Sequence, residues 1–461
     1  MTTDAAMAAD PAEPPAVSEA PGPSRAQLLA SLRRMLSDPL GYLGQARDSY
    51  GPVTAFVVTD PPAILLSDPA DVHRVLVANH RAYTKRTVQY DTLATVTGDG
   101  LLVSDPPLWT QRRRVLQPGF HRDSLADVGR HTVTAARAQA DRLAAGPAIA
   151  DLDEAMMHAA LQVVGAALFS ADLSAQAGTL VPAVLTALDR VVVRARSPWL
   201  PPPPVPTPGN LRLRRALATI EEAVVDLTSQ RRARGEPRGD VLDLLLDGID
   251  EGDVQAVRDE VVTLLIAGHE TVASALTWAW HLLTGRPEAY DRMVAEVDDV
   301  LGDRPAGVAD LPQLPWTRAV VDEALRLYPP AWILTRRAAA ADMLAGYRVP
   351  AGTLVLISTY ALHRDPRLWD APDSFLPERW LDGDGGATSR WAYVPFGAGP
   401  RQCIGKDFAL VEATLMLATF TQRLRVRRPA GAVDPRVEAL VTLRPRGGLW
   451  LEVHDRARRS P

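Results

Sequence analysis

The only cysteine of the chain lies in a loop whose composition suits one special bond. The stretch runs Phe396-Gly-Ala-Gly-Pro-Arg-Gln-Cys403-Ile-Gly405. A single thiol cannot form an internal disulfide, and the C-x2-C or Cys/His clusters typical of a zinc site are absent from the sequence. Cys403 therefore either packs as an inert side chain or binds one partner through its sulfur.

The surroundings of Cys403 favour the ionised thiolate. A helix-period run follows from Asp407 to Phe420, so Cys403 would lie just before a helix N-terminus, where backbone N–H groups stabilise an anion. Arg401 adds positive charge that also favours a thiolate. The loop contains residues that constrain the backbone, the glycines by permitting positive φ and the proline by fixing a turn: Gly397, Gly399, Pro400 and Gly405.

A buried free cysteine is the ordinary interpretation of a lone thiol, but the spacing favours another. The pattern F-x-x-G-x-R-x-C-x-G, from Phe396 to Gly405, resembles the haem-binding loop of the cytochrome P450 monooxygenases. In that family the cysteine thiolate is the axial ligand of the iron. The resemblance implies a haem b cofactor, with Cys403 as its metal ligand and Phe396 and Arg401 among the residues that bind it.

Three further residues match family positions that bind the haem propionates. Trp109 and Arg113 are four residues apart and share one face of a predicted helix. Alone they would indicate only an amphipathic helix, whereas W-x-x-x-R in the family supplies an indole N–H and a guanidinium to a propionate. Arg336, in an extended segment, matches the position from which many members reach a propionate.

The longest helix signal begins near Gly252 and runs to about Thr284. It is apolar on nearly all sides and long enough to span a bilayer. Gly268, His269 and Glu270 in its middle would hardly be accommodated on a lipid-facing helix, so a buried central helix is predicted.

The centre of this helix, residues 267–271, matches the family's A-G-x-[D/E]-T oxygen-binding motif, which is read as a helix distorted at its small residues. The resemblance places Ala267 and Gly268 at the cofactor, assigns Thr271 to hydrogen-bonding the activated dioxygen, and assigns Glu270 to relaying protons from water. The pentapeptide alone would fit a threonine bonded back to a helix carbonyl and a glutamate in a surface stripe. His269 is interpreted as structural or solvent-linked.

Three charged residues match a buried triad of the family. Glu323 and Arg326 lie three residues apart on a predicted helix, a pairing that is usually a weak solvated ion pair. The family joins this E-x-x-R motif to an arginine of a later Pro-rich stretch, which is Arg379 here. The resemblance implies that the three residues hold the cysteine loop rigidly.

Composition indicates a soluble globular protein. Of 461 residues, 47% are hydrophobic and 23% charged. The net charge of −5 and the absence of basic runs interleaved with aromatics speak against nucleic acid as a partner. Residues 1–24 lack the basic start and apolar block of a signal peptide, so we predict a disordered tail, no membrane anchor and a cytoplasmic location, which suits a reduced thiol.

The resemblance runs from about Tyr42 to Val453 and implies one haem domain, residues 25–461. The expected fold is mainly α with small β-sheets, the cytochrome P450 fold, a triangular-prism helical domain around a buried haem. Strands are predicted at 53–58 and 63–67, and one helical pattern covers 24–50. The Pro-rich segment 197–208 could be a domain linker, but the family places a surface loop over the substrate entrance there.

The implied function is that of a haem-thiolate monooxygenase acting in secondary metabolism, as a monomer. It would use O2 and electrons from a ferredoxin or flavodoxin-type donor with its reductase, because no flavin or ferredoxin domain follows in the chain. A peroxide-driven peroxygenase of the same fold is an alternative, although those members replace the acid-alcohol pair. A non-enzymatic haem sensor would need the thiolate loop and no proton relay.

The substrate is expected to be a large hydrophobic molecule, a terpenoid or long-chain lipid, which is hydroxylated or epoxidised. Lys85 and Arg86, at the pocket mouth, could hold the carboxylate of a fatty acid. The family's pocket-lining segments map onto 83–102, 264–271, 331–335 and 439–441. Near the iron their residues are uncharged, which speaks against an anionic or sugar-like substrate: Leu264, Leu265, Ala267, Trp332, Ile333, Leu334, Leu440 and Val441.

Overall fold

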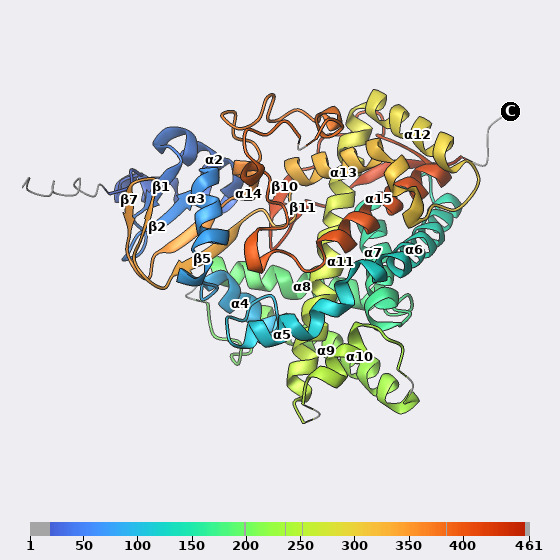
Figure 1. Cartoon of the computed structure of the whole chain (residues 1–461), viewed down its shortest axis with the longest axis horizontal. Helices are drawn as coiled ribbons and strands as arrows, with labels where there is room; N and C mark the ends of the chain where they lie inside the picture. Colours follow the sequence, from blue (N-terminus) through green and yellow to red (C-terminus); the bar gives the residue numbers. More distant parts are fainter. Residues whose placement is uncertain (1–18, 198–199, 236, 251, 384, 457–461) are drawn as a thin grey trace, which may run out of the picture.

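The computed structural model describes residues 19–197, 200–235, 237–250, 252–383 and 385–456 (Figure 1). Most of the chain forms a helical bundle, and a smaller sheet region lies beside it. The long helix α11 (Val254–Gly285) runs through the bundle, where α7, α13 and α15 pack against it. The bundle helices are α4 Val88–Thr97, α5 Leu108–Leu116, α6 Leu125–Ala145, α7 Leu152–Phe169, α8 Ala177–Arg196, α9 Pro208–Arg234, α10 Val241–Gly248, α12 Pro287–Leu301, α13 Pro315–Leu327 and α15 Lys406–Arg423.

The sheet region is built on five strands in the order β1-β2-β8-β5-β3, in which only β2 and β8 are parallel. Its strands are β1 Val53–Phe56, β2 Ala63–Leu66, β3 Tyr83–Thr84, β5 Leu334–Ala338 and β8 Leu354–Ile357. Four helices accompany it: α1 Arg25–Ser37, α2 Pro39–Tyr50, α3 Pro69–His73 and α14 Thr359–Leu362. A three-stranded sheet and two hairpins complete the strands: β4 Ile149–Asp151, β12 Trp450–Asp455 and β9 Leu424–Arg427; β6 Asp342–Leu344 and β7 Tyr347–Val349; β10 Val437–Ala439 and β11 Leu443–Pro445.

Short helical turns fill several connections. One is a π turn and the others are 3-10 turns: η1 Arg74–Ala78, η2 His80–Ala82, η3 Gln117–Phe120, η4 Arg122–Ser124, η5 Val308–Gln313, η6 Pro377–Trp380, η7 Arg390–Ala392 and η8 Gly399–Arg401.

The predicted N-terminal elements are present with small changes. The two strands end at Phe56 and Leu66, slightly earlier than predicted. The single helical pattern over 24–50 is two helices, because Asp38 leaves the helical conformation and accepts a hydrogen bond from the Gly41 N–H, while Pro39 begins α2.

The predicted disordered tail falls mostly outside the described residues, which begin at 19. Within its last part, the carbonyl of Pro21 accepts a 2.8 Å hydrogen bond from the Ala55 N–H, and Ser24 caps α1. Ordered structure therefore starts before residue 25, because these backbone groups are bound to β1 and α1.

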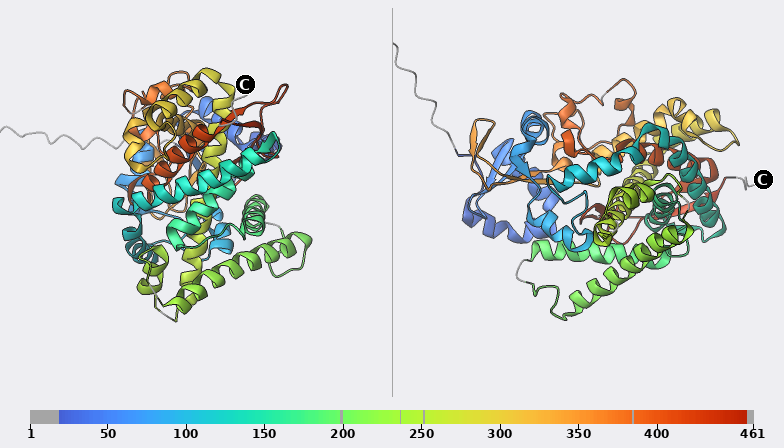
Figure 2. Two further views of the ribbon diagram at one scale, coloured as in Figure 1. Left: turned by 90° about the vertical axis from the view of Figure 1, so that its right-hand side faces the viewer. Right: turned by 60° about the horizontal axis from the view of Figure 1, so that its bottom comes forward.

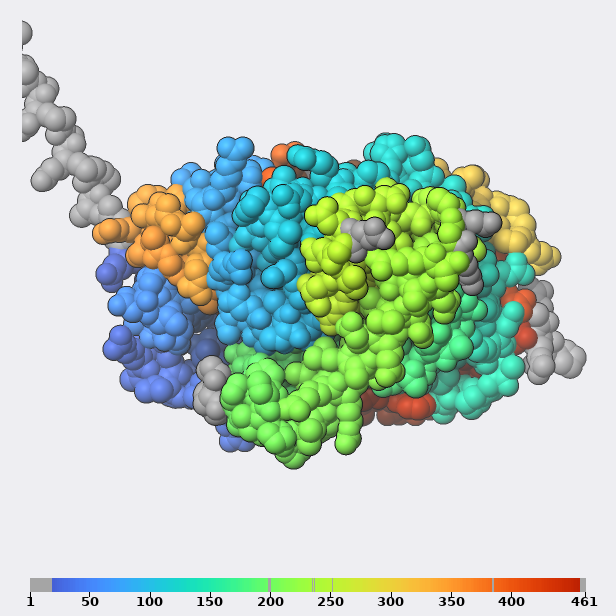
Figure 3. All heavy atoms as spheres, turned by 90° about the horizontal axis from the view of Figure 1, so that it is seen from below, coloured from blue at the N-terminus to red at the C-terminus, as the bar shows by residue number. Residues whose placement is uncertain are grey.

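The Pro-rich segment 197–208 connects α8 to α9, and the two helices lie side by side (Figure 2). The side-chain amide of Asn210 donates to the carbonyls of Pro202 and Val205, both at 2.9 Å, which closes the connection as a compact loop. Figure 3 shows the described part of this connection at the surface of the molecule. Residues 200–207 of the segment thus form a surface loop between packed helices, and residues 198 and 199 lie outside the described part of the chain.

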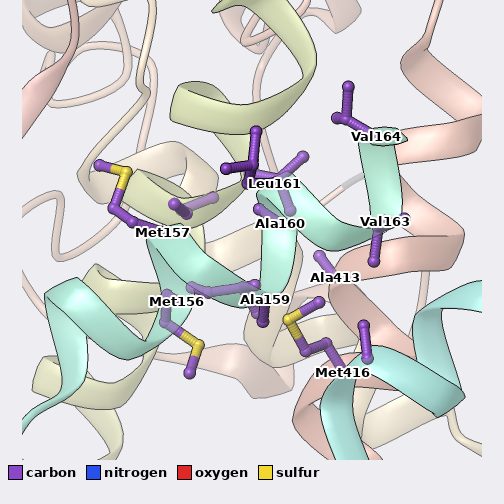
Figure 4. Packing of buried hydrophobic residues seen from close by; sticks show 14 of the residues in the cluster. Met156, Met157, Ala159, Ala160, Leu161, Val163, Val164, Ala413 and Met416 are labelled. Atoms are coloured by element: carbon purple, nitrogen blue, oxygen red, sulfur yellow. The ribbon is translucent and has the colours of Figure 1, made fainter. Parts of the chain in front are cut away.

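The core of the bundle is packed closely around α7 and α11. Met156 of α7 and Met416 of α15 are fully buried and lie in one cluster (Figure 4). In the part of the chain that the structure describes, α11 is the one helix long and apolar enough to cross a membrane, but 83% of its apolar window is buried inside the protein. It is therefore the core helix that the sequence predicts, since its apolar surface is already covered by other helices.

Candidate active site

The cysteine loop is held by its own backbone. The Cys403 N–H donates to the Phe396 carbonyl at 3.0 Å, and the Gly405 N–H bonds to the Cys403 sulfur. Gly399 has a φ of 69°, and a Cβ there would lie 2.1 Å from the carbonyl oxygen of Leu76 in η1, so only glycine fits. Gly405 differs from the prediction, because its φ of −91° needs no glycine.

The thiol of Cys403 retains accessible surface, yet protein surrounds it closely enough for burial to raise its pKa. An accessible thiol can also be desolvated in this way when its free surface faces the interior of the protein. The Gly405 N–H and the positive charges of Arg113 and Lys85 act in the opposite direction and lower the pKa. The predicted thiolate therefore depends on those cations, and an iron ion bound to the sulfur would add the strongest such effect.

Cations gather around this loop. Arg401 pairs with Asp105 at 2.7 Å and lies over the ring of Trp109, 4.2 Å from its centroid. Arg113 donates to the carbonyl of Gln402 at 3.1 Å. The sequence-predicted residues Trp109, Arg113 and Arg401 are thus brought together at the cysteine.

Arg336 and Lys85 complete the group. Arg336 is 6% exposed and donates to the Thr335 carbonyl, and Lys85 is 7% exposed with its ammonium on the Leu102 carbonyl. Burial, followed by the charges of Arg336 and Arg401, holds the pKa of Lys85 well below its usual range. Arg336 and Arg401 therefore lie close enough to Lys85 to repel its charge.

The donor set fits a haem group. Among the described residues, no carboxylate lies within ion-pair distance of Lys85, Arg113 or Arg336, although each is partly or fully buried. Buried cations are costly unless an anion is supplied. Two propionates would satisfy this requirement beside a thiol that can ligate iron.

The expectation that Lys85 and Arg86 together form a cationic mouth is wrong. The Arg86 side chain is 70% exposed, 4.0 Å from Asp105, whereas Lys85 points into the protein. Neighbouring side chains of an extended segment point to opposite sides, which separates the two charges. This alternation is the signal that could have assigned Lys85 to the cofactor side.

The predicted oxygen-binding segment lies on α11. The helix is continuous through it, so the predicted distortion is not observed, and the Thr271 hydroxyl donates to the Ala267 carbonyl at 2.6 Å. A Cβ on Gly268 would lie 2.8 Å from Val164 of α7. Close packing of α11 on α7 therefore explains this glycine, and its contact with a cofactor stays a prediction.

Glu270 is buried, 2% exposed, and accepts a 2.9 Å hydrogen bond from the Thr442 hydroxyl. Burial raises its pKa to about 7, against the opposing charge of Arg444 and the bond from Thr442. A carboxyl with this pKa can take up and release a proton near neutral pH. Thr442 is a residue that the sequence did not single out, because it lies far from Glu270 along the chain.

His269 is fully buried, and neither ring nitrogen has a hydrogen-bond partner in the described residues. Burial and the charge of Arg444 lower its pKa to about 3, so the ring is neutral. Its role, structural or linked to solvent, therefore stays a prediction.

The predicted triad is present, with Glu323 and Arg326 fully buried and the Arg379 side chain 9% exposed. Glu323 accepts two hydrogen bonds of 2.8 Å from Arg326 and one of 3.1 Å from Arg379. The Trp380 indole and the Leu376 N–H also donate to it, at 2.8 and 2.9 Å. Every donor comes from α13 or the η6 region, so the carboxylate ties these two segments together.

His363 connects this cluster to the cysteine loop, which the sequence did not indicate. Its Nδ1 lies 3.2 Å from the Arg326 carbonyl, and its Nε2 accepts the Val394 N–H at 3.0 Å. Burial lowers its pKa to about 3, so a neutral ring donates from Nδ1 and accepts at Nε2. The position of Phe396, two residues after Val394, is thereby linked to the triad.

Comparisons with known proteins agree with this geometry. The sequence profile described as "Cytochrome P450" matches residues 21–451. The chain is 37% identical to "Cyclooctatin synthase" of Streptomyces melanosporofaciens over 89% of this chain and 91% of that protein. It is 36% identical to "Pentalenene oxygenase" of Streptomyces avermitilis, over 85% and 86% of the two chains. The crystal structure of CYP175A1 from Thermus thermophillus superposes with a TM-score of 0.77 at 32% identity, over 94% of this chain and all of that one.

Proposed function

Because the chain belongs to the cytochrome P450 family of haem-iron monooxygenases, we propose that it binds haem b through Cys403 and uses O2 to hydroxylate or epoxidise a terpenoid. The observation that carries this proposal is the group of buried or partly buried cations without a carboxylate partner, beside the single accessible thiol. The domain boundary at 25–461, the monomeric state and the cytoplasmic location stay predictions.

Bound to the thiolate, haem supplies the oxygen-activating chemistry. The residues of this chain orient it and control protons. Lys85, Arg113 and Arg336 would hold the propionates. On the other side, the Thr271 hydroxyl is 2.6 Å from the Ala267 carbonyl and can turn to donate its proton elsewhere.

Glu270 would resupply that proton. Its pKa of about 7 makes both protonation states accessible at neutral pH. Buried apolar residues of α11, such as Leu264 and Leu265, exclude bulk water, so protons must arrive through defined groups. The intact pair of acid and alcohol supports a monooxygenase over a peroxygenase or a haem sensor.

The substrate class follows from charge and from the relatives. Lys85 cannot bind the carboxylate of a fatty acid at the pocket mouth, because its buried side chain lies beside Arg336 and Arg401. Trp332 and the half-buried Val441 are uncharged, as a hydrocarbon substrate requires. Two relatives are named for cyclooctatin and pentalenene, which supports a terpenoid over a fatty acid.

The electron donor is proposed to be a ferredoxin or flavodoxin-type protein with its reductase. A surface hollow of about 890 Å³ lies over α5 and η3. Three arginines and two carboxylates line it, so its charge is net positive: Arg113, Arg114, Arg122, Asp123 and Asp407. Phe120 in the same hollow lies 3.6 Å from a Cβ built on Gly405, next to the cysteine loop. An acidic donor docked there would be near the thiolate side of the haem.

Spectral titration of the purified haem protein tests the substrate class. A sesquiterpene hydrocarbon, a fatty acid and its methyl ester are added separately, and displacement of iron-bound water is followed in the Soret region. We expect the terpene to bind more tightly than the acid, with an oxygenated product in the reconstituted system. Binding confined to charged or strongly polar compounds would contradict the proposal.

A further inference from the structure

One face of α11 is bonded to the β10–β11 hairpin at three places. The Thr442 hydroxyl donates to Glu270 at 2.9 Å, while Ser274 and the Trp278 indole donate to the Leu443 carbonyl at 2.6 and 3.0 Å. The three α11 residues are four positions apart, so they share one face of the helix. Glu270 is therefore the end of a continuous contact between this helix and the hairpin.

Thr442 directly follows the tip of the hairpin. The Leu440 N–H donates to the Thr442 carbonyl at 3.1 Å, which makes a tight turn, and the Trp332 indole donates to the Leu440 carbonyl at 2.9 Å. Leu440 and Val441, which the family resemblance assigns to the substrate pocket, are partly buried. A substrate that contacts Leu440 or Val441 would therefore lie within two residues of the hydroxyl that binds Glu270.

Charged groups face Glu270 from each element packed against it. Arg444 of β11 lowers its pKa, while Asp153 of α7 and Asp189 of α8 raise it. Asp153 is engaged, since it pairs with Arg444 at 2.5 Å and accepts from Thr277 at 3.2 Å. His269, next to Glu270, is buried and neutral. Among these groups of the described residues, only Thr442 donates a hydrogen bond to the carboxyl itself.

We propose that Thr442 is the positioning residue for Glu270 and holds its carboxyl against the hairpin tip. The hairpin that contacts the substrate would thereby also control how Glu270 supplies protons. This inference rests on the proposed function, in which Glu270 relays protons. The hydroxyl donates to the carboxylate and so favours its ionised form. Loss of the hydroxyl frees the side chain and favours the protonated form.

The test follows the carboxyl directly, without substrate. Infrared spectra of the ferric haem protein are recorded against pH, and the band of protonated Glu270 is assigned by its loss in Glu270→Gln. We expect a midpoint of about 7 in the parent protein. In Thr442→Val the midpoint should rise by about one pH unit, the size expected for one hydrogen bond to a charged group.

Three further variants complete the design. Thr442→Ser keeps the hydroxyl and should restore the parent midpoint, and Thr442→Ala replaces the valine variant if that one does not accumulate. Thr132→Val removes a buried hydroxyl of α6, which donates to the Val128 carbonyl at 2.8 Å, and should leave the midpoint unchanged. The fraction of electrons recovered in product should fall several-fold in Thr442→Val and recover in Thr442→Ser.

The outcomes separate the two proposals. A parent midpoint retained in both Thr442→Val and Thr442→Ala overturns the positioning role, whatever their thermal stability. If the parent protein oxidises no terpenoid while the midpoint moves as expected, the proposed substrate is wrong and Thr442 still positions Glu270.

Discussion

Two buried carboxylates of this protein have opposite surroundings. Glu323 accepts five hydrogen bonds, two from Arg326 and one each from Arg379, Trp380 and the Leu376 N–H. Glu270 accepts its recorded bond from Thr442, and its pKa rises to about 7. The first arrangement fixes a charge and the segments around it, whereas the second keeps a proton exchangeable. The carboxylate near the cysteine loop is thus saturated with hydrogen bonds, whereas the carboxylate on α11 is not.

The largest expected effect comes from removing the thiol that the saturated region holds. Cys403→Ala should lose the thiolate spectrum and monooxygenation completely, because the described residues offer no other sulfur ligand there. The measurement is the ferrous carbon monoxide difference spectrum, in which thiolate ligation gives a far-red-shifted Soret band.

Far-ultraviolet circular dichroism of the same variant serves as the control for folding. A thiolate-type spectrum in folded Cys403→Ala would mean that the iron ligand lies elsewhere. An imidazole-like spectrum in the parent protein would lead to the same conclusion.

Glu323→Ala should cost about 3–5 kcal/mol of unfolding free energy and prevent haem incorporation, since it leaves two buried guanidinium groups unpaired. The matched control is Asp127→Ala, which removes an exposed pair with Arg130 and should change stability by less than about 1 kcal/mol. Denaturant unfolding and haem content measure both variants. If the two variants behave alike, the saturated cluster is not what holds the loop.

Glu260 extends the comparison to the pH dependence of stability. This α11 carboxyl is buried, accepts the Leu101 N–H at 3.1 Å, and has a pKa raised by burial to about 7 from an ordinary value of 4.5. A raised carboxyl pKa means that the folded protein binds the proton more tightly. The contribution of Glu260 to the free energy of unfolding is complete at pH values below 4.5 and is lost as the pH rises through 7.

Glu260→Gln should therefore flatten the fall in stability between about pH 5 and pH 8, by up to about 3 kcal/mol. Urea unfolding of the haem protein at the two pH values gives the difference. Asp127→Asn, at an exposed carboxyl, should keep the parent slope. If the unfolding free energy of Glu260→Gln falls with pH as steeply as that of the parent protein, Glu260 does not titrate between about pH 5 and pH 8. The contrast with the hydrogen-bonded carboxylate of Glu323 would then be weaker.

The smallest change is expected in Thr271→Ala. Haem and substrate binding should be retained, while the yield of product per electron falls several-fold and peroxide rises, because a proton donor is lost. Thr284→Ala is the matched control, since its hydroxyl also bonds back along α11, to the Trp280 carbonyl at 2.8 Å. Product formation that stays tightly coupled in Thr271→Ala would remove Thr271 from the relay and favour a peroxygenase.

Residues close together in the chain were predicted correctly more often than residues brought together by folding. The cysteine loop and the Glu323–Arg326 pair are local patterns. The pair is present as predicted, and the loop turns as predicted at Gly399 but not at Gly405. Lys85 was misplaced, because Leu102, whose carbonyl accepts from its ammonium, and Arg401, whose like charge lowers its pKa, come from other segments. The helix distortion at Gly268 was also wrong, since contact with Val164 of α7 explains the glycine.

The amino-acid sequence by itself determined the family, the mainly helical fold and the identity of the loop around Cys403, because spacing within one loop or one helix constrains backbone geometry directly. Only the tertiary structure decided which groups bind the buried charges. His363 reaches Val394, and Thr442 reaches Glu270 across 172 residues of chain. Desolvation and long-range hydrogen bonds set the pKa of a carboxyl, and both depend on the packed neighbours rather than on the local sequence.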